Sequence, residues 1–285
     1  MKLDPDWLER QYNNRARVPE SAQLMQRWAQ ASAHVRAQAS ARIDQAYGSH
    51  PSETLDVFLP TGTRRQPAPV LFFIHGGWWR ALDKSDHSWL APAFCDAGAV
   101  VVVPNYALCP AVHIDDIALQ MTRAVAWTWR HAPQLGADPR KLVVAGHSAG
   151  GHLSAMMLSA NWTQVDPQMP PHAVQQALSL SGVFDLEPLR QTPFLQRDLR
   201  LTPAAVQRLS PARFPAPAGT LHVLAGSLES DEFLRHNRLI QERWGLESVP
   251  TCETLAWCNH FTVLDDFASP QGASHRLARR LLGLS

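Results

Sequence analysis

Apolar positions change their spacing after the first fifty residues of the chain. Before that point they recur three or four residues apart over residues 19–48, which predicts a helix that ends near Gly48. After that point they form short runs. The runs at 70–74 and 99–103 are continuously apolar, as in strands buried on both faces. Residues 54–59 alternate instead, which predicts an antiparallel edge strand.

The same rhythm continues through most of the remaining chain. Further strands are predicted at 142–145, 177–180, 221–224 and 252–255, with a helix over 114–130 and a turn at 137–140. Strands that alternate with helices predict an α/β fold with a mostly parallel central sheet flanked by helices. Such sheets bind their ligands at the carboxyl ends of the strands.

Two segments fall outside the alternation of strands and helices. Residues 183–218 hold many prolines and arginines and two short amphipathic stretches, which predicts a helical, lid-like insertion. Residues 1–48 form an N-terminal helical extension that packs on the side of the domain or partly covers a pocket. The length of 285 residues suits a single domain over residues 1–285.

The pentapeptide at residues 146–150 reads G-H-S-A-G and stands between a predicted strand and a predicted helix at 151–158. A strand that turns sharply into a helix exposes the hydroxyl of Ser148 and leaves the N–H of Ala149 free to bind an oxyanion. The pentapeptide alone also fits a tight turn with a solvated serine. The rest of the chain is therefore needed to distinguish a nucleophile from a structural turn.

A serine nucleophile needs a base and an acid that orients the base, and in such sheets the chain order is serine, acid, histidine. His260 is the best candidate base because its loop follows the predicted strand at 252–255. The other histidines after Ser148 lie on predicted helices, in a strand or before one, where a structural role suits them: His152, His172, His222, His236 and His275.

Glu229 is the candidate acid because it lies directly beyond the predicted strand at 221–224. Three carboxylates are rivals for this role. Asp231 and Glu232 follow closely but suit the first turn of the next helix, where acids favour the helix dipole. Asp185 lies beyond the preceding strand.

A second glycine-rich segment, His75-Gly76-Gly77-Trp78-Trp79, follows the predicted strand at 70–74. Paired glycines allow backbone N–H groups to point into a pocket, which predicts an oxyanion hole from Gly76, Gly77, Trp78 and Ala149. Trp78 and Trp162 are candidates for an indole-lined pocket wall, whereas Trp127 and Trp129 suit core packing. Further candidate pocket residues are Trp79, His147, Phe184 and Phe261.

Charge and cysteine content exclude several function classes. The chain has 26 basic and 25 acidic residues, which argues against an electrostatic nucleic-acid binder. Its four cysteines have no C-x-x-C spacing, which indicates reduced thiols in the cytoplasm. No secretory signal and no apolar run of about 18 residues is visible, so membrane attachment is not expected. The spacing of His147 and His152 does not suit a metal, and no G-x-G-x-x-G motif suggests a dinucleotide, so no metal and no cofactor are expected.

Five segments together resemble the kynurenine formamidase (arylformamidase) branch of the α/β-hydrolase esterases: H-G-G-W-W at 75–79, G-H-S-A-G-G-H-L at 146–153, G-V-F-D-L at 182–186, E-S-D-E-F at 229–233 and N-H-F at 259–261. The resemblance runs from about residue 54 to 267, and Y-N-N-R at 12–15 also resembles bacterial members. Glu229 stands where aspartate is better known, Trp78 where tyrosine is frequent and Asn259 where aspartate is frequent.

The resemblance implies an α/β-hydrolase fold and a serine hydrolase with Ser148 as nucleophile, Glu229 as acid and His260 as base. The expected partner is a small ester or N-formyl arylamide substrate, with no nucleic acid and no membrane, and a homodimer is one open alternative for the oligomeric state. Two other functions stay open: a general carboxylesterase without a formamidase role, and a hydrolase fold that only binds a ligand.

Overall fold

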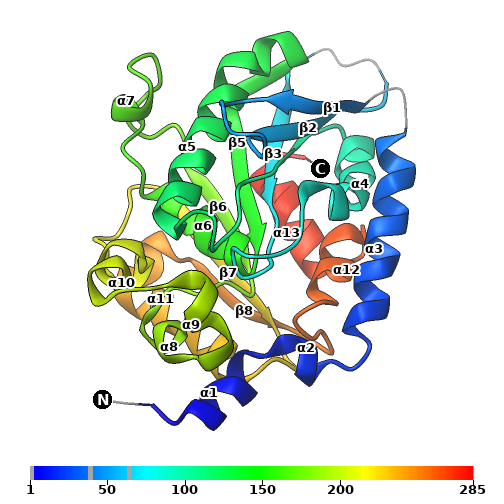
Figure 1. The fold of residues 1–285 in the computed structure, drawn as a ribbon. Helices are drawn as coiled ribbons and strands as arrows, with labels where there is room; N and C mark the ends of the chain where they lie inside the picture. The colour runs from blue at the N-terminus through cyan, green and yellow to red at the C-terminus, as the bar shows by residue number, and fades with distance from the viewer. Residues whose placement is uncertain (1–2, 38–40, 63–65, 285) are drawn as a thin grey trace.

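A central eight-stranded sheet organises the protein, whose computed structural model describes residues 3–37, 41–62 and 66–284. Its strand order is β1-β2-β4-β3-β5-β6-β7-β8 (Figure 1). The strands are β1 (Ala41–Ala46), β2 (Thr54–Phe58), β3 (Ala68–Ile74), β4 (Val100–Pro104), β5 (Ala137–His147), β6 (Gln176–Leu180), β7 (Thr220–Gly226) and β8 (Thr251–Leu255). The β1–β2 and β2–β4 pairs are antiparallel, and every pair from β4 to β8 is parallel. The carboxyl ends of β3 and β5 to β8 therefore meet at one edge of the sheet.

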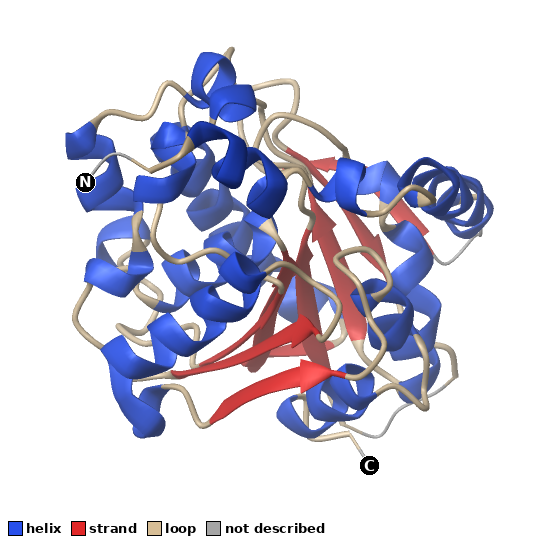
Figure 2. Ribbon diagram, turned by 90° about the horizontal axis from the view of Figure 1, so that it is seen from below, coloured by secondary structure: helices blue, strands red, loops and turns tan. Residues whose placement is uncertain are grey.

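Helices cover both faces of this sheet (Figure 2). The α-helices are α1 (Pro5–Tyr12), α2 (Asn14–Arg17), α3 (Ser21–Arg36), α4 (Ala91–Ala97), α5 (Ile114–His131), α6 (Ala149–Leu158), α7 (Trp162–Val165), α8 (Glu187–Gln191), α9 (Pro193–Leu199), α10 (Pro203–Leu209), α11 (Asp231–Ser248), α12 (Val263–Ala268) and α13 (Ala273–Leu281). Short 3₁₀ helices are η1 (Lys84–Asp86), η2 (Ser88–Leu90), η3 (Ala132–Leu135) and η4 (Pro211–Arg213).

Strand β3 shows why the central strands are apolar at every position. Val70, Phe72 and Ile74 join the core that includes side chains of α5, α6 and α11. Leu71 and Phe73 point to the opposite face and join the core that includes side chains of α3, α4, α12 and α13. Each fully buried side chain of this size contributes about 1.5–3 kcal/mol. The continuous apolar runs thus reflect a sheet covered on both faces, and the predicted α/β architecture is confirmed.

The predicted helix over residues 19–48 is wrong in its second half. Helix α3 ends at Arg36, and Ala41–Ala46 forms β1, which pairs with β2 at the edge of the sheet. Side chains of β1 are half-buried and exposed in alternation, as an edge strand requires. Ile43 happened to continue the helical spacing of α3, and Ala39 lies outside the described residues.

Two smaller predictions also need correction. Strand β2 is not at the edge, because it lies between β1 and β4 and is buried at four of its five positions. The predicted turn at residues 137–140 belongs to β5, since Ala137 already pairs with Ala68 of β3.

Residues 183–218 connect β6 to β7 and hold α8, α9, α10 and η4. Helix α1 packs on α8, α9 and α11, so the N-terminal segment joins this helical layer (Figure 1). Helix α3 instead runs along the side of the domain against η1 and η2. Helix α3 therefore packs on the side of the domain, which is one of the two alternatives left open above. That residues 183–218 act as a lid stays a prediction.

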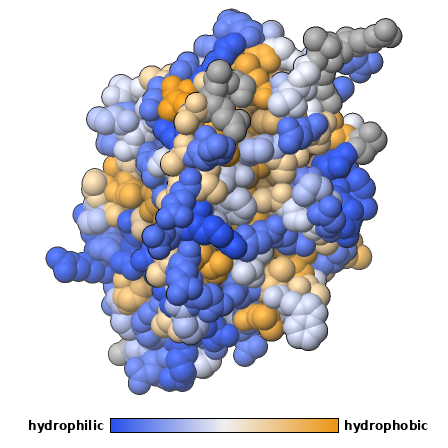
Figure 3. All heavy atoms as spheres, turned by 90° about the vertical axis from the view of Figure 1, so that its right-hand side faces the viewer, coloured by the Kyte–Doolittle hydropathy of each residue, from blue (hydrophilic) through white to orange (hydrophobic). Residues whose placement is uncertain are grey.

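The outer surface of the protein mixes polar and apolar side chains. Figure 3 shows the face that carries α3, where hydrophobic residues are scattered among hydrophilic ones. Within the described residues, no helix is both long enough and apolar enough to cross a bilayer.

Candidate active site

Ser148 occupies a sharp elbow between β5 and α6. Its φ and ψ are 55° and −115°, a backbone conformation that costs a non-glycine residue about 1–3 kcal/mol. A β-carbon at Gly146 would lie 2.2 Å from the carbonyl oxygen of Gly150, and one at Gly150 would lie 2.0 Å from the carbonyl oxygen of Ile74. Both glycines of the pentapeptide are therefore required by space, and the strained turn presents the serine beyond the end of the strand.

His260 and Glu229 form a buried pair at the neighbouring strand ends. His260 Nδ1 lies 2.6 Å from Glu229 Oε2. The other carboxylate oxygen accepts hydrogen bonds from Ser181 Oγ at 2.5 Å and from the N–H of Gly226 at 2.7 Å. Because both carboxylate oxygens are engaged, Glu229 fixes the ring of His260 and leaves its Nε2 for another partner.

Ser148 and His260 line the same cavity, whose volume is about 450 Å³. The ring of His147 lies 4.7 Å from that of His260, and its Nε2 lies 2.7 Å from the carbonyl oxygen of His260, which links the two loops. In the described residues Ser148 and His260 form no direct hydrogen bond. Such catalytic contacts are often long in unliganded enzymes. Burial, and then the nearby His260, hold the pKa of His147 well below its usual range, so this ring is neutral and donates through Nε2.

The glycine segment after β3 passes directly beside Ser148. A β-carbon at Gly76 would lie 3.1 Å from Ser148 Cβ. Tyr106 Oη donates to the carbonyl oxygens of His75 and Gly76, at 3.0 and 3.2 Å. In a trans peptide the N–H points opposite to the carbonyl, so the N–H of Gly77 points away from Tyr106. Ala149 is the first residue of α6, so its N–H has no acceptor within the helix.

Gly77 is restricted in a second way. Its φ is +105°, and a β-carbon there would lie 2.0 Å from the carbonyl oxygen of Ala81. Trp78 follows with a φ of 55° and lines the cavity. The segment therefore has the backbone freedom and the position that donors to an oxyanion require.

A buried polar network supports this segment from behind. The ring of His75 stacks on Tyr106 with centroids 4.2 Å apart, and its Nε2 lies 3.2 Å from Asn105 Oδ1. Asn105 Nδ2 donates to Asp83 Oδ2 at 2.6 Å. Burial lowers the pKa of His75, and the contact of its Nδ1 with the carbonyl oxygen of Gly76 at 2.8 Å partly opposes that shift.

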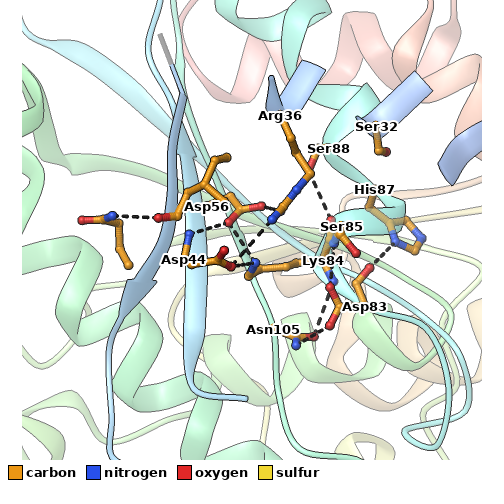
Figure 4. A network of polar contacts seen from close by, with 12 residues as sticks. Ser32, Arg36, Asp44, Asp56, Asp83, Lys84, Ser85, His87, Ser88 and Asn105 are labelled. Carbon is orange, nitrogen blue, oxygen red and sulfur yellow. Dashed lines mark hydrogen bonds and ion pairs between the residues drawn. The ribbon is translucent and has the colours of Figure 1, made fainter. Parts of the chain in front are cut away.

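The network continues into the edge of the sheet (Figure 4). Lys84 follows Asp83 and is the first residue of η1. It forms an ion pair of 2.9 Å with Asp56 of β2 and a second ion pair with Asp44 of β1. Arg36 at the end of α3 also pairs with Asp56. These contacts fix η1 against the antiparallel strands, and so they fix the loop that positions Asn105 and His75.

Aromatic side chains dominate the walls of the cavity. Those that line it are Trp28, Trp78, Phe194 and Phe261, and the charged lining residues are Arg15, Arg80 and Asp198. Arg80 pairs with Asp198 and lies over the ring of Phe194, 5.5 Å from its centroid. Among the described residues, no group of three or more histidines, cysteines or carboxylates could hold a metal ion.

Three predictions about the pocket are wrong. Trp79 is fully buried and packs edge-on against His152 at 4.9 Å, with its ring 6.3 Å from that of Trp78. Phe184 is fully buried beside His236, and Trp162 is fully buried in α7. None of the three is among the cavity-lining residues, whereas the predicted residues His147 and Phe261 are.

The rival acids have other partners. Glu232 accepts from Tyr12 Oη at 2.5 Å and pairs with Arg235. Asp185 pairs with Arg213 at 3.2 Å, and Asp231 begins α11 at the surface. Of the carboxylates considered, Glu229 is the one that the fold places against His260.

Sequence reasoning missed several residues at this site. Ser181 donates to the carboxylate of Glu229, and Tyr106 donates to the backbone of His75. No sequence motif predicts either contact. Asn14, Arg15 and Trp28 reach the cavity from the N-terminal helices. The only signal for them in the sequence was the Y-N-N-R segment at residues 12–15.

Comparisons with known proteins agree with this geometry. The BD-FAE family model matches residues 55–204, more than half of the chain. A kynurenine formamidase of Danio rerio is 29% identical over 252 residues, which cover 85% of this chain and 82% of that protein. The esterase LipC of Mycobacterium tuberculosis is 32% identical over 152 residues, or 52% of this chain and 38% of that protein.

One crystal structure is similar over nearly the whole fold. It is described as a candidate thioesterase from Silicibacter sp. TM1040, is 31% identical, covers 92% of this chain and 95% of its own, and has a TM-score of 0.79. With formamidases and esterases as its relatives, the chain is a hydrolase of esters or formamides. The matching model, the relatives and the fold together show that the chain belongs to the BD-FAE family of α/β hydrolases.

Proposed function

We propose that the protein hydrolyses small aryl esters and N-formyl arylamides through a covalent intermediate on Ser148. The observation that carries the proposal is the His260–Glu229 pair, 2.6 Å apart, which opens onto the same cavity as the strained Ser148 elbow. A nucleophile, a base and an orienting acid in one place are what acyl transfer requires.

In the first half of the reaction, Ser148 Oγ attacks the carbonyl carbon of the substrate while His260 Nε2 takes the hydroxyl proton. The negative oxygen of the tetrahedral intermediate accepts hydrogen bonds from the N–H groups of Gly77 and Ala149. Collapse of the intermediate breaks the bond to the leaving group. His260 returns its proton to that group, which departs as a phenol or an arylamine.

In the second half, water attacks the acyl or formyl ester of Ser148 and gives its proton to His260. The carboxylic acid leaves, and His260 returns the proton to Ser148. Glu229 stabilises the protonated ring of His260 through its contact with Nδ1, while Ser181 and the N–H of Gly226 hold its other oxygen in place.

An aromatic leaving group is supported by the cavity walls. Trp78, Phe194 and Phe261 surround the space beside Ser148, and apolar rings of this kind pack well on another ring. The kynurenine formamidases among the relatives support the formamide, and the esterases support the ester.

The test is hydrolysis of p-nitrophenyl acetate and of N-formylkynurenine by the wild type and by Ser148→Ala. We expect both activities in the wild type and a loss of at least about 10⁴-fold in the variant. Full activity of Ser148→Ala on either substrate would refute the mechanism.

A general carboxylesterase is the second candidate, and the similarity to LipC favours it. The two candidates differ in the ratio of kcat/KM for N-formylkynurenine to that for short acyl esters. A ratio far below one assigns the protein to the esterases, and a ratio near or above one assigns it to the formamidases.

The binding partner that this proposal assigns to the site is a small aryl ester or N-formyl arylamide. The free thiols of Cys95, Cys109, Cys252 and Cys258 support action in a reducing compartment such as the cytoplasm.

A further inference from the structure

Two buried hydrogen-bond donors in the cavity wall have no partner. Asn14 is 5% exposed and Trp28 is 2% exposed, and both line the cavity. Neither Asn14 Nδ2 nor Trp28 Nε1 makes a hydrogen bond within the described residues. An unsatisfied buried donor costs about 1–3 kcal/mol, and these two belong to residues that line one cavity, so a ligand bound there is a source of the missing acceptors.

The same wall carries an uncompensated positive charge. The charged lining residues are Arg15, Arg80 and Asp198. Asp198 is already paired with Arg80, whereas Arg15 forms no ion pair within the part of the chain that the structure describes. Arg15 is exposed, and among the described residues the hydrogen bond of its guanidinium goes to the sulfur of Met25, at 3.7 Å. One guanidinium beside two free donors suits an anion that accepts several hydrogen bonds.

This wall is held in place by the fold. Tyr12, two residues before Asn14, donates to Glu232 at 2.5 Å and lies 3.1 Å from His236 Nε2. Its ring meets Trp78 edge-on at 6.0 Å, beside the candidate oxyanion segment. The N-terminal segment is therefore anchored to α11 and to the catalytic loops, and Asn14 is presented from a fixed position.

Building on the function proposed above, we propose that Asn14, Arg15 and Trp28 form a subsite that binds a carboxylate on the leaving group of the substrate. A carboxylate offers about four acceptor positions, enough for the amide of Asn14, the indole N–H of Trp28 and the guanidinium of Arg15. Neutral aryl esters leave these donors unpaired and are the poorer substrates.

The test compares aryl acetates with and without a carboxylate on the leaving group, and the variants below serve as the reference for differences in intrinsic reactivity. The 3- and 4-acetoxybenzoates carry the carboxylate, and their methyl esters have the same aryl acetate without it. Two ring positions are used so that one of them reaches the subsite. In the wild type we expect kcat/KM for at least one acetoxybenzoate to exceed that of its methyl ester by roughly tenfold, the gain of one charged hydrogen bond.

The variants are Asn14→Ala, Arg15→Ala and Trp28→Phe, the last of which keeps an aromatic ring, though a smaller one, and removes the N–H. Each should lower the preference for the carboxylate about tenfold, mainly through KM, and should leave the methyl esters within about twofold. Arg17→Ala is the matched control. It removes an arginine of the same short helix that is not among the cavity-lining residues, so the preference should not change.

The outcomes separate the subsite from the reaction. A wild type without preference, or variants that lose both substrates equally, would overturn the carboxylate subsite while Ser148-dependent hydrolysis continues. A wild type that cleaves none of the four esters, or a Ser148→Ala variant that cleaves them all, would overturn the proposed function itself. A preference that falls in the three variants and persists in Arg17→Ala supports the subsite.

Discussion

Two sides of the active site differ in whether their polar groups already have partners. On the side of β7 and β8, the carboxylate of Glu229 accepts from His260, Ser181 and Gly226, so the acid is held before any substrate arrives. On the side of the N-terminal helices, the donors of Asn14 and Trp28 have no partner. Catalysis gains from groups that need no reorganisation, whereas binding gains from groups that the ligand completes. We therefore infer that the side of Glu229 and His260 carries out the reaction, and we call it the chemical wall. The side of Asn14 and Trp28 selects the substrate, and we call it the selective wall.

The largest expected effect comes from breaking the chemical wall. Glu229→Gln keeps the shape but removes the charge that stabilises protonated His260, so we expect kcat to fall by about 10⁴, as for the comparable change in serine proteases. Steady-state hydrolysis of p-nitrophenyl acetate measures this. Asp231→Asn, two residues later and exposed, is the control and should stay within twofold. A loss below tenfold in Glu229→Gln would remove Glu229 from the mechanism.

Gly77→Ala tests the oxyanion segment on the same wall. The new methyl group would meet the carbonyl oxygen of Ala81, and the φ of +105° disfavours alanine, so the segment has to shift. Displacing one oxyanion donor should lower kcat by roughly 10²–10³ with a smaller change in KM. Gly136→Ala has a positive φ but open space around it, and it controls for backbone strain alone. Equal effects of the two substitutions on kcat would contradict the assignment.

Three buried histidines away from both walls should make the free energy of unfolding depend on pH. Burial lowers the pKa of His87 and His236 to about 3 and that of His152 to about 4, against about 6.5 in the unfolded chain. Below pH 6.5 the unfolded chain binds more protons than the folded one, so the free energy of unfolding falls as the pH falls toward 4. Above pH 6.5 these histidines add no pH dependence.

Each of these histidines should contribute about 1.4 kcal/mol per pH unit in that window. Urea unfolding at pH 7.5 and 5.5 measures the change. His152→Gln keeps a donor for the carbonyl of Leu209, to which His152 Nε2 is bonded, and should reduce the pH dependence by one proton. An unchanged slope would mean that His152 is not held neutral.

The smallest expected effect is on the selective wall. Asn14→Ala removes a buried donor that has no partner, and with it the cost of leaving that donor unpaired, so the free energy of unfolding should not fall. Ser181→Ala, which takes a donor from buried Glu229, is the contrast and should cost about 1–3 kcal/mol. Thermal or urea unfolding of both variants decides. A cost for Asn14→Ala as large as that for Ser181→Ala would show that Asn14 already has a structural role.

The chemical wall could be predicted from the sequence far better than the selective one. Ser148, Glu229 and His260 each follow a strand, and the rule that such strand ends meet brings them together without knowledge of side-chain packing. Phe184 also follows a strand, yet its ring turns into the core beside His236, because a strand end fixes where a residue lies and not where its side chain points.

The predictions that were wrong, or that the sequence did not allow, concern features that depend on packing between distant segments. Trp78 and Trp79 both have a φ of 55° and their rings lie 6.3 Å apart, yet Trp78 lines the cavity and Trp79 does not, a difference that periodicity does not predict. Strand β1 reads as helix because Ile43 continues the spacing of α3, and only its pairing with β2 overrides that pattern. Asn14 and Trp28 reach the cavity because α1, α2 and α3 fold back onto the domain, a tertiary arrangement that the hydrophobic pattern does not predict.

The most direct measurement of the central claim is reaction with a fluorophosphonate probe, followed by mass spectrometry of the labelled peptide. The account predicts a single adduct on Ser148 in the wild type, no adduct in Ser148→Ala, and a labelling rate at least about 10³-fold lower in His260→Ala, because the base that activates the hydroxyl is gone. An adduct on another residue, or equal labelling rates in His260→Ala and the wild type, would contradict it.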